Sequence, residues 1–151
     1  MNLNIKKLHP NAKLPTYGTE QAAAFDLYAC TVDGYEQTGS IIYPGKPVTV
    51  GTGLAFDIPE GWCLMVYSRS GMGFNHGIRL ANGTGLIDSD YKGEVMVKLV
   101  CDNEYETPDW IDPGSRIAQA RLEPVTRCTF TEVDQLTATE RGTGGFGSTG
   151  A

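Results

Sequence analysis

Short runs of apolar and β-branched residues alternate with polar turn residues along most of the chain. These runs predict strands at Leu3–Leu8, Phe25–Cys30, Ser40–Tyr43, Val48–Val50, Leu54–Ile58, Cys63–Tyr67, Ile78–Leu80, Glu94–Cys101, Ile117–Val125 and Cys128–Val133. No helical apolar period is sustained, and a turn or two of helix is expected only after Ser70. Many short strands at close spacing indicate an all-β fold of antiparallel sheets, either sandwiched or closed into a barrel.

Strong turn sequences separate the predicted strands. They are Pro44-Gly45, Pro59-Glu60-Gly61, Asn82-Gly83 and Pro113-Gly114. Proline presets φ and glycine accepts a positive φ, which are the two conditions that tight turns impose. The dipeptide Asn82-Gly83 favours a tight hairpin in particular.

The end of the chain, Thr137 to Ala151, differs from the rest. It consists mostly of glycine, serine and threonine, with Phe146 as its one aromatic residue. Such a segment cannot bury enough surface to offset its ordering entropy, so it should be mobile unless a ligand orders it. We therefore predict a β domain over residues 1–136 and a flexible tail over residues 137–151.

Charge and composition narrow the classes of partner. The chain has 12 Lys and Arg against 18 Asp and Glu, a net charge of −6, which opposes broad binding to nucleic acid or anionic lipid. A phosphate ligand must then be held locally, by a few cations, N–H donors or a metal. No leader or membrane span is visible, which predicts a cytoplasmic protein. Cys30, Cys63, Cys101 and Cys128 lack metal-site spacing, so small apolar strand residues are expected there.

Two clusters place polar groups beside predicted strands. Asp26 lies in the apolar run Ala24–Ala29, where a hydrogen-bonded strand residue is a commoner role than a metal neighbour. Ser68–Gly73 follows an apolar strand and offers hydroxyls, N–H groups and the Arg69 guanidinium. That combination suits either phosphate binding or a salt-bridged surface turn.

Two acidic residues follow the Asn-Gly turn. If residues 86–91 are extended, Asp88 and Asp90 point to one side of the strand, and Ile87 and Tyr91 point to the other. Paired aspartates suit a general base or a cation site, but the further oxygen ligands of an EF-hand are missing.

Two further stretches complete the candidates. In Pro113–Ala120, Arg116 and Gln119 would lie on opposite faces of a regular strand, and an ordinary strand entry is the simpler interpretation. The tail lacks the lysine and the following helix of a Walker loop. Its Arg141 and Phe146 can nevertheless hold phosphate and stack on a base.

Taken together and in this order, the five clusters resemble the five motifs of the trimeric dUTP pyrophosphatase (dUTPase) family. The resemblance extends from Asp26 to Gly150 and is most specific in the third and fifth motifs. It implies a jelly-roll β-barrel or sandwich, assembled as a homotrimer whose active sites each draw on all three subunits. It also implies hydrolysis of dUTP to dUMP and pyrophosphate, which keeps uracil out of DNA and supplies dUMP for dTMP synthesis.

The resemblance assigns roles to individual residues. Asp88 matches the general base that activates water against the α-phosphorus, and Tyr91 matches the residue beneath the deoxyribose that excludes a 2′-hydroxyl. Uracil is bound by backbone groups and one side chain, at Asn82, Gly85, Leu86, Ile87 and Met96. Phosphate contacts come from Arg69, Ser70, Gly71 and Gln119, and the closing lid from Arg141, Phe146, Gly147, Ser148 and Thr149.

The family also implies Mg²⁺, held by the triphosphate and water without a direct protein ligand, with Asp26 as a candidate for its outer shell. Some positions depart from the pattern. Ala24 replaces the usual glycine of the first motif, Ser115 replaces the usual acidic residue of the fourth, and Asp33–Tyr43 is longer than in the shortest bacterial members.

Two rival interpretations stay open. A dCTP deaminase shares the family's fold but needs a glutamate acid/base and usually lacks the tyrosine, so Tyr91 and the glycine-rich tail favour dUTPase. The second rival is a regulatory protein that binds a partner through Asp33–Tyr43. The presence of Asp88 argues that catalysis is kept.

Overall fold

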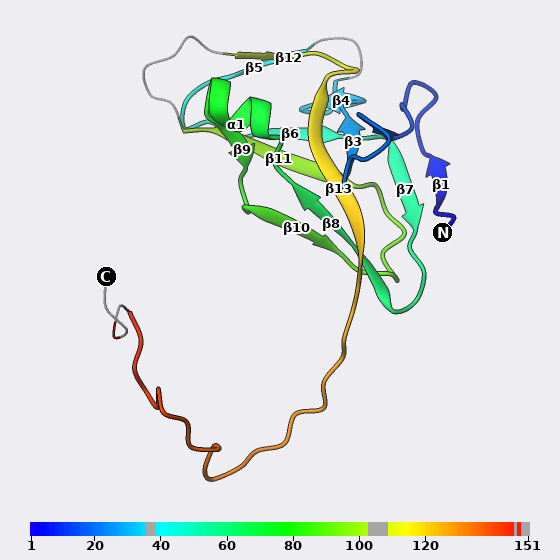
Figure 1. Cartoon of the computed structure of the whole chain (residues 1–151). Helices are drawn as coiled ribbons and strands as arrows, with labels where there is room; N and C mark the ends of the chain where they lie inside the picture. Colours follow the sequence, from blue (N-terminus) through cyan, green and yellow to red (C-terminus); the bar gives the residue numbers. More distant parts are fainter. Residues whose placement is uncertain (36–38, 103–108, 147, 149–151) are drawn as a thin grey trace.

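The computed structural model describes residues 1–35, 39–102, 109–146 and 148 (Figure 1). Its strands are β1 (Asn4–Lys7), β2 (Thr16–Tyr17), β3 (Phe25–Tyr28), β4 (Thr31–Val32), β5 (Ser40–Ile42), β6 (Val48–Gly51), β7 (Leu54–Asp57), β8 (Trp62–Tyr67), β9 (Ile78–Leu80), β10 (Thr84–Ile87), β11 (Met96–Cys101), β12 (Asp109–Ile111) and β13 (Arg116–Pro124). One helix, α1 (Ser70–His76), follows β8 within these residues.

Two antiparallel sheets make up most of the body. One has the strand order β10-β8-β13-β3-β2 and the other β4-β6-β11-β9, while β1 pairs with β7 and β12 with β5. Along β11 the burial alternates, so that Val97, Leu99 and Cys101 point inward. They join inward residues of the other sheet, such as Leu64 and Leu27, in one apolar core. The sheets of the described residues form a jelly-roll-like sandwich and do not join into a closed barrel.

The all-β prediction is confirmed. Each predicted strand up to Val125 matches a strand of the structure to within two residues at either end, and the expected helical turn is α1. The strands that the pattern missed are β2, β4, β10 and β12. Within the described residues each of them lies at the edge of its sheet. Edge strands bury little of their surface and so carry a weak apolar signal.

The predicted turns form, but one prediction about them is wrong. Gly83 has a φ of +72° and its N–H donates to the carbonyl of Leu80 at 3.1 Å, as a tight turn requires. The flanking strands do not pair with each other, since β9 bonds to β11 and β10 bonds to β8. Asn82-Gly83 therefore carries the chain from one sheet to the other and closes no hairpin.

The predicted strand Cys128–Val133 is absent. Beyond Pro124 the chain leaves the body as an extended segment (Figure 1), in which Phe130 and Leu136 are almost fully exposed. An isolated extended segment has no partner for its backbone groups and so forms no strand by itself. We call residues 125–136 the arm; the tail follows it.

The cysteines follow the expectation in three positions. Cys30, Cys63 and Cys101 are buried, whereas Cys128 is exposed on the arm, contrary to prediction. Burial raises the pKa of the Cys63 thiol, and the charges of Glu123 and Asp88 add to that effect. None of the helices that the structure describes has the length and apolar character to cross a bilayer.

Candidate active site

A hollow of about 280 Å³ opens between β10 and the segment that leads into β11. It is lined by Leu86, Ile87, Asp88, Tyr91, Glu94 and Met96. β10 forms one wall of this hollow. It is held in place by the pairing of Gly85 and Ile87 with Val66 and Leu64 of the neighbouring strand β8. The site thus brings together an aspartate, a tyrosine and two stretches of accessible backbone.

A turn places Asp88 and Tyr91 in the same hollow. β10 ends at Ile87, and the N–H of Tyr91 donates to the carbonyl of Asp88 at 3.2 Å. Residues 86–91 are therefore not extended throughout, so the condition under which Asp88 and Tyr91 would point to opposite sides is not met. The turn cancels the predicted separation of Asp88 and Tyr91 onto opposite faces, since both now line one hollow.

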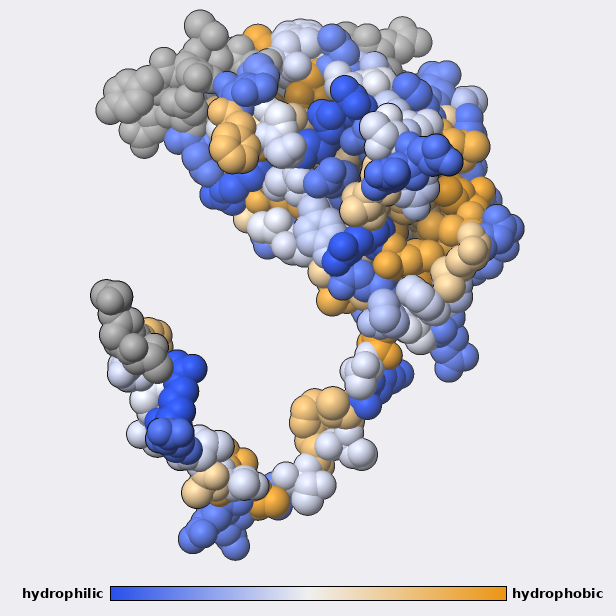
Figure 2. All heavy atoms as spheres, viewed as in Figure 1, coloured by the Kyte–Doolittle hydropathy of each residue, from blue (hydrophilic) through white to orange (hydrophobic). Residues whose placement is uncertain are grey.

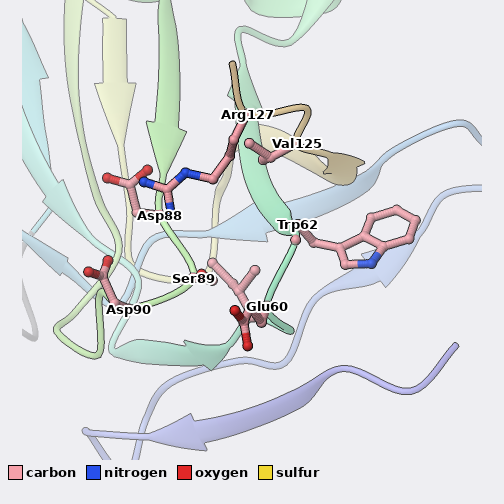
Figure 3. A pocket seen from close by; sticks show the side chains of 9 residues that line it. Glu60, Trp62, Asp88, Ser89, Asp90, Val125 and Arg127 are labelled. Carbon is pink, nitrogen blue, oxygen red and sulfur yellow. The ribbon is translucent and has the colours of Figure 1, made fainter. Parts of the chain in front are cut away.

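Asp88 also borders a second and larger hollow, of about 770 Å³, on its other side. Figure 3 shows Arg127 of the arm pointing toward Asp88 across this space, with Asp90, Glu60 and Trp62 around it. Arg127 belongs to an exposed segment and was not singled out from the sequence. The space beside Asp88 is thus open to solvent and can admit a large ligand.

A second polar cluster lies at the other end of β8. The Asp26 carboxylate bonds to Arg69 Nε at 3.1 Å through one oxygen and to Arg116 at 3.2 Å through the other. The Gln119 amide donates to the carbonyl of Ser68 at 3.3 Å. The expectation that Asp26 is a hydrogen-bonded strand residue is confirmed, and Arg69, Ser70 and Gln119 come together as one group.

A β-bulge decides which face Arg116 occupies. The pairing of β13 with β3 shifts register between Arg116 and Ala118. Gln119 lies directly opposite Asp26, so their side chains share a face, and Arg116 reaches the same Asp26. Arg116 and Gln119 would lie on opposite faces only of a regular strand, and here the extra residue of the bulge reverses the alternation.

The two clusters are far apart in one chain. Ile87 pairs with Leu64, so Asp88 lies beside the start of β8, whereas Arg69 follows its end. Five or six residues of extended chain at about 3.3 Å each separate the two side chains by roughly 15–20 Å. Between them the Tyr67 hydroxyl donates to Glu123 at 2.5 Å. This bond raises the pKa of Tyr67 and lowers the pKa of Glu123.

Asn82 and the residues of the tail complete the predicted set. Asn82 is exposed in the turn before β10, at the end of that strand farther from Asp88. On the tail, Arg141 Nε donates to the carbonyl of Gly144 at 2.8 Å, and Phe146 and Ser148 are exposed. Gly147 and Thr149 lie outside the described residues.

Comparison with known proteins places this arrangement in a family. The family model described as dUTPase matches residues 10–150. The deoxyuridine 5'-triphosphate nucleotidohydrolase of Nautilia profundicola is 45% identical over 150 residues, which cover 99% of each chain. The chain belongs to the dUTPase family.

Solved dUTPase structures share the fold. A mutant dUTPase of Staphylococcus bacteriophage 80alpha, solved with dUpNHpp, superposes with a TM-score of 0.82 at 23% identity and covers 99% of both chains. A mutant dUTPase from phage phi11 of S. aureus, a structure concerned with coordination of a structural Mg(II) ion, has a TM-score of 0.75 at 19% identity. It covers 89% of this chain and 98% of its own. The jelly-roll assignment rests on this agreement.

Some residues around this candidate site were not found from the sequence. Glu94 lines the smaller hollow, and its partner, the Gly53 N–H, is 41 positions away along the chain. Arg116 was named only as a strand residue, because its contact with Asp26 depends on the bulge. The proximity of Arg127 to Asp88 depends on where the arm lies. No local pattern signals any of these contacts.

Proposed function

We propose that this protein hydrolyses dUTP to dUMP and pyrophosphate, which lowers the dUTP available to DNA synthesis and supplies dUMP for dTMP synthesis. The observation that carries the proposal is the smaller hollow, where a carboxylate, a tyrosine ring and the backbone of two strands meet. Backbone groups can bind the edge of a small base, the tyrosine ring can contact a deoxy sugar, and the carboxylate can activate an attacking water. Both substrate and product are soluble nucleotides, so we assign the enzyme to the cytoplasm, or to the host's cytoplasm if the source is viral.

In the reaction Asp88 accepts a proton from water as the water oxygen bonds to the α-phosphorus. The bond between the α-phosphorus and the bridging oxygen breaks, and pyrophosphate leaves with that oxygen. Backbone groups of Gly85, Leu86, Ile87 and Met96 bind the uracil edge, and Asn82 assists them. Tyr91 lies beneath the sugar. Its hydroxyl is engaged by the Glu94 carbonyl at 2.9 Å, which leaves the ring to contact C2′.

The triphosphate is held by Arg69, Ser70, Gly71 and Gln119. In one chain these residues lie too far from Asp88 to share a nucleotide with it, so they must come from another copy. The lid residues, Arg141, Phe146, Gly147, Ser148 and Thr149, close over uracil and the γ-phosphate. In this proposal Arg69 and Arg141 place positive charge beside the phosphates of the substrate, although the chain as a whole is acidic.

A homotrimer accounts for the exposed apolar surfaces. The arm exposes Phe130, Val133 and Leu136. On the body, apolar side chains gather beside β1 (Figure 2), where Leu3, Tyr17, Phe25, Trp62 and Leu122 are among the residues lining a hollow of about 530 Å³. Apolar surfaces of this kind mark contacts between proteins, and contacts between copies would cover them.

Mg²⁺ is the expected cofactor. As the resemblance implies, the triphosphate and water would supply its ligands. When bound, the ion would neutralise charge on the phosphates during attack and departure. Each oxygen of Asp26 bonds to one arginine, and its remaining lone pairs could accept a hydrogen bond from a metal-bound water in the outer shell.

Pyrophosphate release, measured in parallel with dUTP, UTP, dTTP and dCTP, tests the proposal. Release with dUTP alone is the expected result. Ammonia release from dCTP would favour the deaminase instead. Equal turnover of all four nucleotides would contradict selection at this site.

A complementation experiment tests the shared site. Asp88→Asn and Arg69→Ala should each be almost inactive alone, because each lacks one half of every site. When the two chains are co-assembled at equal amounts, random association leaves about one site in four with both wild-type residues. We expect close to a quarter of wild-type activity. If the base and the arginine served one site from the same chain, mixing would restore nothing.

The role of Tyr91 is tested by substitution. Because a ribose hydroxyl would clash with the ring or be buried unpaired, UTP should be a poor substrate. Tyr91→Ala should narrow the difference in kcat/KM between dUTP and UTP by roughly tenfold, mainly by impairing dUTP. Steady-state kinetics with both nucleotides measures this difference. An unchanged difference would mean that the tyrosine does not select the sugar.

A further inference from the structure

The segment that carries Tyr91 is fastened to the connection between β6 and β7. The Glu94 carboxylate accepts the N–H of Gly53 at 2.7 Å. The Thr52 hydroxyl donates to the carbonyl of Val95 at 2.7 Å and accepts the N–H of Leu54 at 3.2 Å. Thr52 is the one fully buried polar side chain among the described residues. We call the Glu94 carboxylate and the Thr52 hydroxyl together the clamp.

The clamp controls the group that orients Tyr91. The Tyr91 hydroxyl donates to the carbonyl of Glu94 at 2.9 Å, so the far end of the ring is tied to the clamped residue. Tyr91 is 43% exposed, so the burial of its side chain is only partial. If the Glu94 backbone moves, this hydrogen bond moves the ring with it.

Two glycines provide the space that this arrangement needs. A Cβ at Gly93 would come within 2.6 Å of the Tyr91 hydroxyl and 2.7 Å of Cζ, so the ring packs directly on the backbone of residue 93. A Cβ at Gly51 would come within 2.5 Å of the Glu94 carboxylate oxygen. The tyrosine and the glutamate therefore both occupy closely fitted positions, and both positions are set by backbone geometry.

We propose that Glu94 is a positioning residue for sugar selection. Its carboxylate, held by the Gly53 N–H, fixes the backbone of Glu94 and thereby the position of the Tyr91 ring relative to the deoxyribose. The inference rests on the proposed function, in which Tyr91 lies beneath that sugar. Glu94 acts through Tyr91 and need not contact the substrate. Position 94 requires a hydrogen-bond acceptor within reach of the Gly53 N–H, and the negative charge of the side chain matters less.

Three substitutions separate distance from charge. Glu94→Gln keeps an acceptor oxygen at the same distance, Glu94→Asp keeps the charge but shortens the side chain by one methylene, and Glu94→Ala removes both. The ratio of kcat/KM for dUTP to that for UTP should stay within about twofold of wild type in the Gln variant and fall roughly tenfold in the Asp and Ala variants. The fall should come mainly from a higher KM for dUTP, because packing against the sugar is made on binding.

Lys92→Ala is the matched control. Lys92 lies in the same segment and forms an ion pair with Asp57 at 2.8 Å, but both side chains are more than half exposed. Such a pair contributes little, so the nucleotide ratio should not change. Melting temperature and oligomeric state, measured for every variant, identify any that fails to fold. If the Glu94→Ala variant does not fold, the nucleotide ratio of the Glu94→Asp variant tests the inference by itself.

The possible failures are distinguishable. A wild-type protein without preference for dUTP over UTP would contradict the proposed function. A selective wild type whose ratio survives Glu94→Asp and Glu94→Ala would contradict the inference alone. A ratio lost equally in the Gln variant would also overturn it, since the acceptor oxygen would then not be what matters.

Discussion

Replacing Asp88 with asparagine is expected to slow dUTP turnover by roughly 10²–10⁴ while leaving the fold and nucleotide binding intact. The side chain is exposed in the turn after β10 and lies between the two hollows, where a substrate and an attacking water can both reach it. Asparagine has nearly the same shape but cannot accept the proton. Pyrophosphate release under saturating dUTP measures the loss, and calorimetric titration with a non-hydrolysable analogue measures binding.

Asp57→Asn is a suitable control for this experiment. Asp57 is an exposed acid at the end of β7, and Lys92 lowers its pKa through a hydrogen bond and through its charge. Removing this carboxylate changes the net charge by the same amount as Asp88→Asn but leaves both hollows unaltered. Turnover should stay within about twofold of wild type, since an exposed pair contributes little. Near-normal turnover in Asp88→Asn would exclude the residue as the base.

The sheets could be predicted from sequence because their signal is local. Buried residues of the central strands alternate with polar ones or form short apolar runs, as in β8 and β11. The edge strand β10 lacks that signal: its four residues are exposed or half-buried, and its place is set by pairing with β8. The wall of the candidate site was therefore among the strands that the pattern missed.

The geometry of the polar clusters could not be predicted, for a related reason. The bulge before Ala118 reverses the face of Arg116, and the tight turn after Ile87 brings Asp88 and Tyr91 into one hollow. The bulge adds one residue and the turn spans Asp88 to Tyr91, and a period of two residues cannot anticipate either. The resemblance to the family's motifs names the candidate residues, whereas their mutual placement depends on these irregularities of the backbone.

The arm shows a different limit. Its apolar residues Phe130, Val133 and Leu136 favour a strand or a buried segment, yet all three are exposed in the single chain. Local propensity does not make a strand without a partner for its backbone groups. In the proposed trimer, another copy would supply the partner that the strand predicted in the arm lacks in the single chain.

A chain stopped after Glu140 is expected to keep its melting temperature and oligomeric state but to lose most of its activity. The backbone hydrogen bonds in the described part of the tail are local: the N–H groups of Gly142, Gly144 and Ser148 donate to the carbonyls of Thr139, Arg141 and Gly145. The body should therefore fold without the tail. In the proposed mechanism the same residues bring Arg141 to the γ-phosphate and Phe146 onto uracil, and they exclude water from the closed site.

Phe146→Trp in the full-length chain provides a direct readout of closure. Phe146 is fully exposed in the free protein, and an indole stacked on uracil should change its fluorescence when a non-hydrolysable dUTP analogue binds. Trp62 borders the hollow beside Asp88 and can respond as well, so the unsubstituted chain must be titrated in parallel. The change should be much weaker with dUMP, which lacks the γ-phosphate that recruits Arg141. If the shortened chain turns over dUTP at the wild-type rate, the tail is a linker and takes no part in the active site.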